Sequence, residues 1–513
     1  MHVFYRAIAM VLTLLLFFPA EGKVLFVKKG GKGDGSSWAN AYGELQEALL
    51  SATTGDSIWV ASGIYYPISC VDCSDEERKV SFEIKSGIQL FGGFEGIELR
   101  LEDRKIHAYP TVLSGNIDQD NSFMYNAYSV IYMEAVSNGT SLDGFIVEGG
   151  YADGLGPIGE KTNCGGGVFV KSAGSNATTT PAFLNCIFRN NYARSFGGAF
   201  YLECDFEGKN NAVFEKCFFQ SNSSDLEGGA VYINASFQGI STSRWSYCSF
   251  GENHSGGNGG AFVISGAESG QFEDAFYSCV FEKNTAFGNG GGIFSFAKNG
   301  TGNLSFDNCT FIENSANQGG AMYLDASFAG DQKPKIDQCW FLENSSTIDG
   351  GAVYCLSAPD GWLAADIVDT YFMRNSCGSS GAAIFNNGSQ SGDVISSINR
   401  CKFELNETPN YGGAIYNLGQ SGNASPIILN SLFDRNTAYS AGAIYNLGAG
   451  NGNASPTIVN CSFFSNQSQV GSAIYNNGTD STGSAKPQIY NSVFQGNESP
   501  TGRIFRNIFG FPT

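Results

Sequence analysis

The sequence predicts an all-β protein: a right-handed, single-stranded parallel β-helix with a short N-terminal capping helix. Two observations carry this prediction. A phenylalanine followed three residues later by asparagine recurs every 30 or 31 residues, and a small-residue cluster, usually Gly-Gly-Ala, follows each asparagine. A fixed period of this length is the signature of stacked structural repeats. The repeat phenylalanines are Phe188, Phe219, Phe250, Phe281, Phe311, Phe341, Phe372, Phe403, Phe433, Phe463 and Phe494.

Each repeat also has two fixed positions ahead of its phenylalanine. Two residues before it stands Cys, Ser or Thr, as at Cys217, and three residues earlier stands a large apolar residue, as at Phe214. Residues two apart share a face of a strand, whereas residues three apart do not. A sharp corner between the two positions would turn both inward. Asparagine is frequent there, as at Asn308, and it tolerates the left-handed conformation that a corner needs.

Each coil should therefore contain a strand, a corner, a strand through Cys-x-Phe, a second corner near the repeat asparagine and a strand at Gly-Gly-Ala. Stacked coils place like residues over like at a strand spacing of about 4.8 Å. We expect right-handed winding, because crossovers between parallel strands are almost always right-handed. About eleven such coils fill residues 164–513, after a cap and irregular early coils at 23–163.

The N-terminal residues 1–22 have the pattern of a secretory signal peptide. Arg6 supplies positive charge, and the apolar run Ala7–Phe18 is too short for a comfortable membrane span. Small residues near Ala20 suit cleavage, so the mature chain should begin near Lys23. No later stretch is apolar enough to span a bilayer, which predicts an exported protein without a transmembrane segment after cleavage.

Between the signal peptide and the repeats, we expect one helix at Glu44–Ala52. Its apolar residues Leu45, Ala48 and Leu49 recur at helical spacing. A single amphipathic helix ahead of a β-solenoid suits a cap that shields the first coil from edge pairing. Short strands separated by Gly and Asn turns are predicted at Val24–Val27, Ile58–Ala61, Ile88–Leu90, Thr111–Leu113, Val130–Met133 and Phe145–Glu148.

The composition narrows the classes of partner. The formal net charge of -19 argues against nucleic acid and against electrostatic docking on anionic lipid. Aromatic residues make up 13% of the chain, more than disordered sequences carry. We therefore expect an ordered protein with no nucleic-acid partner. The oligomeric state stays open.

The paired phrases resemble a known family. Phe219-Gln-Ser-Asn222 with Gly228-Gly-Ala-Val231 is similar to the repeats of the chlamydial polymorphic membrane proteins and related bacterial surface proteins, and so is Phe403-Glu-Leu-Asn406 with Gly412-Gly-Ala-Ile415. The resemblance covers roughly Val24 to the end. It implies a surface-exposed right-handed β-helix, often an adhesin passenger, that is secreted, held at the cell surface or associated with the outer membrane.

The 14 cysteines fall into two groups. Eight stand in the slot before the repeat phenylalanine, where parallel Cβ directions disfavour disulfides, so we expect buried free thiols. For Cys70-Val-Asp-Cys73 a local disulfide is favoured over zinc, which would need two more ligands. The sequence does not fix the pairing of the others, although Cys355 and Cys377 lie on neighbouring coils and form a candidate pair. The remaining two are Cys164 and Cys204.

Candidate catalytic acids are Asp118 with Asp120, and Asp366 with Asp369. Glycoside hydrolases need two carboxylates that flank the scissile bond. Neither pair has an obvious Arg, Lys or His partner in the sequence, and Asp is common in turns. We interpret both pairs as turn residues and His254 as a surface residue at a corner. The sequence thus predicts no catalytic, cofactor or metal site, and no cofactor.

A row of aromatic residues is the candidate binding stripe. If its apolar neighbours face inward, the row lies outside and offers flat rings to sugars or to a protein partner. If the row faces inward, it belongs to the core. The alternation of side chains along the strand does not decide between these two arrangements. The tyrosines of the stripe are Tyr201, Tyr232, Tyr323, Tyr354, Tyr416, Tyr445 and Tyr475.

Two functions follow from these patterns. The first is a non-catalytic, secreted or cell-surface adhesin or structural passenger that binds a glycan or a host or matrix surface. The alternative is a carbohydrate-active enzyme, a polysaccharide lyase or glycoside hydrolase, on the same scaffold. A pair of acids with a basic partner on one coil face would favour the enzyme. The sequence favours the first function because packing and turning explain the residues that repeat.

Overall fold

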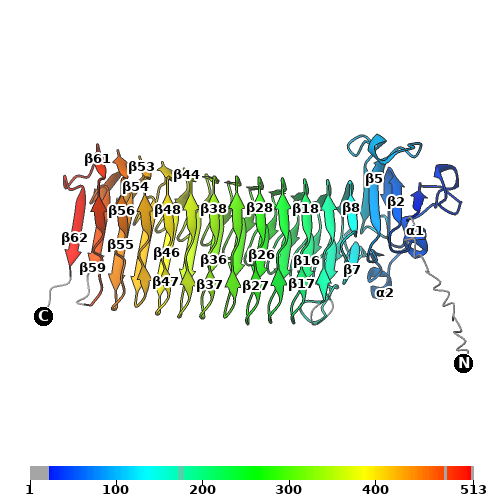
Figure 1. Cartoon of the computed structure of the whole chain (residues 1–513), viewed down its shortest axis with the longest axis horizontal. Coiled ribbons are helices and arrows are strands. Elements are labelled where there is room, and N and C mark those ends of the chain that lie inside the picture. The colour runs from blue at the N-terminus through cyan, green and yellow to red at the C-terminus, as the bar shows by residue number, and fades with distance from the viewer. Residues whose placement is uncertain (1–21, 173, 175–176, 479–481, 510–513) are drawn as a thin grey trace, which may run out of the picture.

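The computed structural model describes residues 22–172, 174, 177–478 and 482–509. The predicted signal peptide lies outside these residues, except for Gly22. The described chain forms a single row of stacked coils that runs from the N-terminal to the C-terminal end, with the strands lying across the row (Figure 1). The predicted parallel β-helix is confirmed.

Three long sheets run along the stack, sheet A with 15 strands and sheets B and C with 14 strands each. Two narrower sheets, D with eight strands and E with nine, consist of two-residue strands. Neighbouring strands pair in parallel, as in Phe188↔Phe219. The first and last strands are β1 (Val24–Val27) and β60 (Gln488–Tyr490) in A, β3 (Gly63–Tyr65) and β61 (Val493–Gln495) in B, β4 (Phe82–Glu83) and β62 (Phe505–Phe509) in C, β10 (Tyr151–Ala152) and β45 (Ser376–Cys377) in D, and β12 (Thr178–Thr179) and β51 (Asn423–Ala424) in E.

A regular coil has five strands rather than the three expected. The prediction of a strand at Gly-Gly-Ala is wrong, because Gly197 and Gly198 form a turn and the strand starts after Ala199. Gly197 has φ +64, and a Cβ there would lie 1.9 Å from the carbonyl oxygen of Phe200, so only glycine fits. One coil comprises β13 (Ala182–Leu184), β14 (Ile187–Arg189), β15 (Tyr192–Ala193), β16 (Phe200–Glu203) and β17 (Lys209–Asn210).

The predicted asparagine corners are confirmed. The corner between the apolar slot and the Cys-x-Phe strand has positive φ, 50° at Asn185 and 54° at Asn308. A second corner precedes the repeat asparagine, with φ of 53° at Asn190. The first corner turns the chain enough for the apolar residue, the thiol and the phenylalanine to face one interior.

Aromatic and aliphatic ladders fill this interior. Phe183, Cys186 and Phe188 are fully buried, and equivalent residues stack from coil to coil. The rings of Phe341 and Phe372 lie 4.8 Å apart at an angle of 6°. This spacing equals the strand spacing, so the in-register pairing of the backbone also stacks the rings.

The repeat asparagines form a buried ladder at the corner between sheets B and D. The side-chain oxygen of Asn222 accepts hydrogen bonds from the backbone N–H and the side-chain amide of Asn191, at 3.1 Å each. The Nδ2 of Asn222 donates to the carbonyl of Phe188 at 2.9 Å. Each asparagine thus satisfies groups of the preceding coil. A second ladder, not anticipated, comprises Asn386, Asn417, Asn446, Asn476 and Asn507 in sheet C, and all of these except Asn507 are buried.

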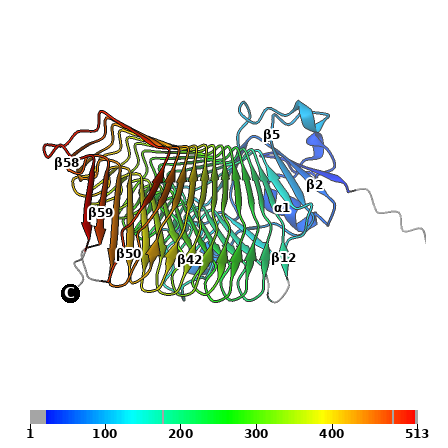
Figure 2. The same ribbon diagram turned by 60° about the vertical axis from the view of Figure 1, so that its left-hand side comes forward.

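The N-terminal end carries the irregular elements. Helix α1 (Leu45–Ser51) buries Leu45, Ala48 and Leu49 in the same core. Figure 2 shows the segment that follows β5 rising above the regular coils. The other elements here are η1 (Trp38–Asn40), β2 (Ser57–Ala61), α2 (Asp75–Arg78), β5 (Gln89–Phe94), η2 (Leu101–Asp103), β6 (Thr111–Ser114), β7 (Ile131–Glu134), β8 (Ser141–Asp143), β9 (Phe145–Glu148) and β11 (Val168–Lys171). Within the described residues, no helix is both long and apolar enough to cross a membrane.

Candidate functional site

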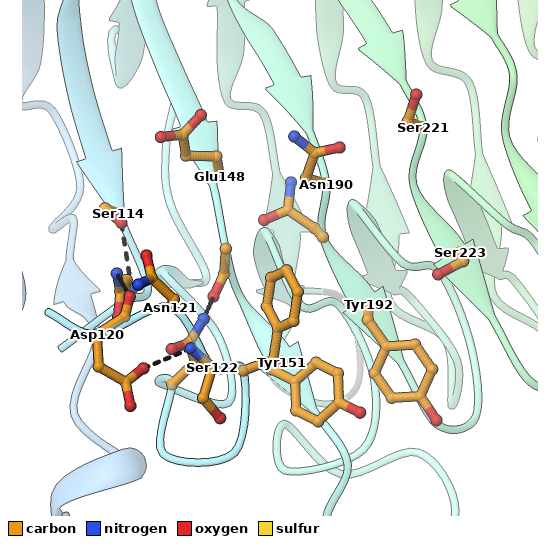
Figure 3. Close-up of a pocket in the computed structure, with 15 residues that line it drawn as sticks. Ser114, Asp120, Asn121, Ser122, Glu148, Tyr151, Asn190, Tyr192, Ser221 and Ser223 are labelled. Carbon is orange, nitrogen blue, oxygen red and sulfur yellow. Dashed lines mark hydrogen bonds between the residues drawn. The ribbon is translucent and has the colours of Figure 1, made fainter. Parts of the chain in front are cut away.

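The candidate site is a cleft of about 450 Å³ near the N-terminal end. One wall is the loop at 115–127 between β6 and β7. The other is the corner where sheet B passes into sheet D in the first regular coils. The lining is mostly amides, hydroxyls and aromatic rings (Figure 3), from Ser114, Asn116, Asp120, Asn121, Ser122, Phe123, Asn126, Glu148, Gly149, Tyr151, Asn190, Asn191, Tyr192, Ser221 and Ser223.

The loop that forms the first wall is held by local contacts. Cys70 and Cys73 form the predicted local disulfide, and the Cys70 N–H donates to the carbonyl of Ile117 at 3.2 Å. Buried Cys73 and Ile117 belong to one small hydrophobic cluster. The disulfide segment therefore braces the cleft wall, and its two sulfurs are bonded to each other rather than to zinc.

Asp120 lies in this wall and has a structural role. Its carboxylate accepts the N–H of Ser122 at 2.6 Å, and its carbonyl accepts the Nδ2 of Asn116 at 2.9 Å. These bonds form a tight polar turn. The turn interpretation of this acid is thus confirmed, although its carboxylate also faces the cleft. Asp118 does not line the cleft.

A stack of three aromatic rings joins the two walls, with Phe123 from the first wall and Tyr151 and Tyr192 from the second. Phe123 lies 5.7 Å from Tyr151, and Tyr151 lies 4.6 Å from Tyr192, with interplanar angles of 25° and 26°. The Tyr192 hydroxyl donates to Asp225 at 2.6 Å. Burial and this hydrogen bond raise the pKa of Tyr192, so the phenol stays protonated at neutral pH. Figure 3 shows Tyr151 and Tyr192 side by side at the cleft.

The stack ends because the following coils carry small or polar residues at the same register. Tyr192 pairs with Ser223, and Ser223 pairs with His254. Sequence reasoning missed these aromatic residues. The available signal was a tyrosine immediately after a repeat asparagine, at Asn191-Tyr192, where the next coil has serine. Phe123 comes from an irregular loop and carried no such signal.

The cleft also holds one acid with a basic partner. Glu148 at the end of β9 accepts from the Nε of Arg189 at 2.7 Å, and both side chains are partly exposed. In the second candidate pair, Asp369 has a basic partner that was not obvious from the sequence. Arg400, one coil away, binds Asp369 through two hydrogen bonds of 2.7 Å and lowers the pKa of that carboxyl.

Metal ligation finds little support in the side-chain arrangement. No group of three or more His, Cys, Asp or Glu could hold a metal ion among the described residues. His254 was expected at a corner but lies just after it, half-buried in a two-residue strand of sheet D, with its Nδ1 2.8 Å from the Thr285 hydroxyl. The cleft therefore offers hydrogen bonds and ring faces as its main binding chemistry.

The aromatic stripe shares a feature with each of the two alternatives: it lies outside the main core, and it is buried. Its apolar neighbours, such as Val231 and Ile415, face the main core, so the tyrosines lie on the outer side of sheet C. They are nevertheless buried, with exposed fractions between 3% at Tyr201 and 8% at Tyr475. Tyr232, Tyr323, Tyr354, Tyr416 and Tyr445 are buried to a similar extent.

The stripe is buried because each ring is covered on both faces. Tyr323 stacks on Tyr354 at 4.8 Å with an angle of 4°, and turn residues such as Phe196 and Tyr411 pack against the row. The Tyr354 hydroxyl accepts the Nδ2 of Asn387 at 2.8 Å. A ligand would have to unstack these rings to reach their faces. The predicted binding role of the stripe stays untested.

The other cysteines are free and buried, all within the described ranges. The eight thiols of the repeat slot match the prediction, and burial raises the pKa of Cys401 to about 12. The candidate pairing of Cys355 with Cys377 is wrong, because Cys355 lies in sheet C and Cys377 in sheet D. Cys164 and Cys204 are likewise unpaired thiols.

Comparison with known proteins agrees with the repeat pattern. The model of the Chlamydia polymorphic membrane protein repeat matches residues 278–295, which include Phe281, Asn284 and Gly290. The chain is thus a parallel β-helix that carries repeats of this type. A comparison with curated proteins found no match.

Among solved structures, a chain titled "Rhamnogalacturonan lyase" is similar to this one at 12% sequence identity. The alignment covers 87% of this chain and 82% of that chain, with a TM-score of 0.26. A likeness this distant does not bear on the substrate of the present protein.

Proposed function

We propose that the protein is an exported, non-catalytic adhesin or structural passenger that binds glycans through the N-terminal cleft. The observation that carries the proposal is the stack of Phe123, Tyr151 and Tyr192 beside a row of amides and hydroxyls. A location at the cell surface or in the medium is supported by the signal-like residues 1–22 and by the match to a membrane-protein repeat.

The chemistry of the cleft suits saccharides. A sugar ring presents C–H groups on its faces and hydroxyls around its edge, so it needs an apolar plane and several hydrogen-bonding groups together. Here Tyr151 and Tyr192 supply the plane, while Asn190, Ser221 and Ser223 supply polar groups on adjacent coils. The backbone of stacked strands holds these groups, which lowers the entropy cost of binding.

Binding to a glycan array by the full chain tests this proposal. We expect Tyr192→Ala and Tyr151→Ala to weaken binding at least about tenfold, since one lost aromatic contact costs about 1.4 kcal/mol or more. Tyr439→Ala is the matched control, because Tyr439 is 55% exposed and lies far along the chain. Equal affinity in all four proteins, or no glycan bound by any of them, would contradict the proposal.

A second candidate is a polysaccharide lyase or glycoside hydrolase at the same cleft. The observation in its favour is that Asp120, Glu148 and the basic partner Arg189 lie in or beside one cleft. Release of oligosaccharides or of unsaturated products from a panel of polysaccharides would identify an enzyme. Glu148→Gln should then abolish turnover while leaving binding nearly unchanged. Turnover that depends on Glu148 would replace the non-catalytic proposal.

A further inference from the structure

A second cluster of exposed aromatic side chains lies where sheet A passes into sheet B, apart from the cleft. Phe218 in β19 (Phe218–Gln220) is 49% exposed, Tyr247 at the next corner is 51% exposed, and Tyr277 in β28 (Ala275–Tyr277) is 44% exposed. The rings of Tyr247 and Tyr277 lie edge to face at 5.4 Å. Exposed apolar groups gathered on one surface mark interaction sites. We call these three residues the aromatic patch.

Two hollows flank the Phe218 side chain. One has a volume of about 440 Å³, and its walls include Ile146, Ile187 and Tyr247. The other, about 240 Å³, has Gln220, Ser249 and Gly251 in its walls. Phe218 lines both hollows. The patch therefore stands in a grooved surface with room for ligand groups on either side of a ring.

The second hollow exists because Gly251 has no side chain. Its strand neighbours at the same register, Gln220 and Glu282, both carry long side chains. A Cβ added at Gly251 would meet no atom within 4 Å, and its φ lies outside the positive range. The glycine is therefore not required by the backbone, in contrast to the turn glycines, and its effect is to leave open space.

The charges around the second hollow select the ligand class. Glu252 and Glu282 line it, and the chain as a whole is strongly acidic, with a formal charge of -19. Lys283 lies 3.4 Å from Glu282 and offsets one of these charges. A polyanionic chain such as a polyuronate would be repelled here, whereas an uncharged sugar would meet ring faces, hydroxyls and carboxylate acceptors.

We propose that the aromatic patch is a second saccharide-binding surface, which takes an uncharged glycan chain independently of the cleft. The rings of Phe218 and Tyr247 contact sugar faces, and the hollow over Gly251 receives one sugar unit beside Phe218. The carboxylates of Glu252 and Glu282 accept hydrogen bonds from sugar hydroxyls. Successive coils, about 4.8 Å apart, present these groups in line along the stack.

The test uses affinity electrophoresis of the full chain in gels that contain β-glucan, xylan or mannan, with polygalacturonate as the anionic comparison. Gly251→Gln fills the hollow at a position where the strand accepts a side chain, so the protein should fold normally. Its matched control is Asp434→Gln, which places the same side chain at the same register in a distant coil. Phe218→Ala removes the ring between the hollows.

For at least one uncharged polysaccharide, we expect Gly251→Gln and Phe218→Ala to weaken binding at least tenfold, while Asp434→Gln and the cleft variant Tyr192→Ala retain it within twofold. Three results would overturn the inference: no uncharged polysaccharide retards the wild type, polygalacturonate binds more tightly, or Gly251→Gln binds normally. Loss of binding in Tyr192→Ala alone would overturn this inference and leave the cleft proposal standing. Loss in Gly251→Gln and Phe218→Ala, with binding retained in Tyr192→Ala, supports this inference and leaves the cleft proposal to be decided by the glycan-array test.

Discussion

Asn284 shows why the repeat requires asparagine. Its side-chain oxygen accepts from the backbone N–H and the side-chain amide of Asn253, at 3.0 and 2.9 Å. Its amide donates to the carbonyl of Phe250 and to Asn314, at 2.9 Å each. A short side chain that offers one acceptor and two donors is unique to asparagine. The ladder thus satisfies buried backbone groups that no strand partner reaches.

Replacing this residue should be costly. Asn284→Asp removes both donors and buries a carboxylate, and each unsatisfied buried group costs about 1–3 kcal/mol. We expect a loss of roughly 3 kcal/mol or more in the free energy of unfolding, measured in urea. Asn303→Asp, at an exposed position at the end of the same coil, is the control. Equal stability of the two variants would show that the ladder is not stabilising.

Asp274 is a buried acid in the core. Its Oδ1 accepts from the Ser241 hydroxyl and the Ser243 N–H, at 3.1 and 3.2 Å, while its Oδ2 has no hydrogen-bond partner. Burial raises the pKa of Asp274 from 3.8 to about 7. The folded state therefore holds a proton that the unfolded chain releases above pH 4. Stability from this group is present at low pH and is lost as pH rises to about 7.

Asp274→Asn should remove this pH dependence. Wild type should lose up to about 1.4 kcal/mol per pH unit relative to the variant between pH 4 and 7, and the difference should level off above that range. Thermal unfolding of both proteins from pH 4 to 9 measures it. Asp307→Asn, at an exposed position in the next coil, should track wild type. Parallel curves for wild type and Asp274→Asn would contradict the prediction.

The thiols of the ladder should not react with thiol reagents in the folded protein. Burial raises the pKa of Cys401 to about 12 and that of Cys377 to about 11, so these two thiols stay protonated at neutral pH. All twelve free thiols are buried and therefore inaccessible to a reagent in the folded chain. We expect the twelve free thiols to react with an aromatic disulfide reagent only after denaturation. Rapid reaction of several thiols in buffer would contradict the packing.

The free energy of unfolding of Cys309→Ser should lie within about 1 kcal/mol of the wild-type value, because serine occupies the same slot in other coils.

At the scale of the element, the turn before the sheet C strands of the regular coils carries glycine at positive φ in nearly every coil, and Ala441 takes this place once, with φ 58. Gly290 has φ +70, and a Cβ would lie 2.2 Å from the carbonyl oxygen of Ile293. Gly290→Ala should cost roughly 1–3 kcal/mol in unfolding free energy. Gly251→Ala is the matched comparison within a strand and should be neutral, since open space surrounds the added methyl group. The reverse order of stability would disprove the role of the turn.

The same elements show what the sequence could reveal. Phe188, Cys186 and Asn185 were predictable because each slot recurs in coil after coil, so packing constraints appear as a period. The narrow sheets D and E were missed, because two-residue strands such as β15 carry no alternation. Tyr151 and Tyr192 are strand partners, and Phe123 reaches them only through the approach of an irregular loop. Residues that meet only through tertiary contact, and that do not recur, carry no periodic signal.

At the scale of the whole molecule, the dominant feature is negative charge on an extended stack. A formal charge of -19 makes the folded chain repel itself. Raising the ionic strength from 0.01 to 0.15 M shortens the screening length from about 30 to about 8 Å. The midpoint of thermal unfolding should then rise, on the order of 2 °C. A fall in the midpoint would indicate that attractive ion pairs, such as Arg400 with Asp369, outweigh the repulsion.

The in-register asparagine ladder also limits how such a chain can change its length. Each asparagine bonds to the coil before it, so a gain or loss of a few residues within a coil would break the ladder on both sides. After a gain or loss of one whole period of 30 or 31 residues, every coil would still bond to a neighbouring coil of the same type. Duplication or deletion of entire coils could thus move the two ends apart or together while the cleft stays intact, so reach and recognition could evolve separately.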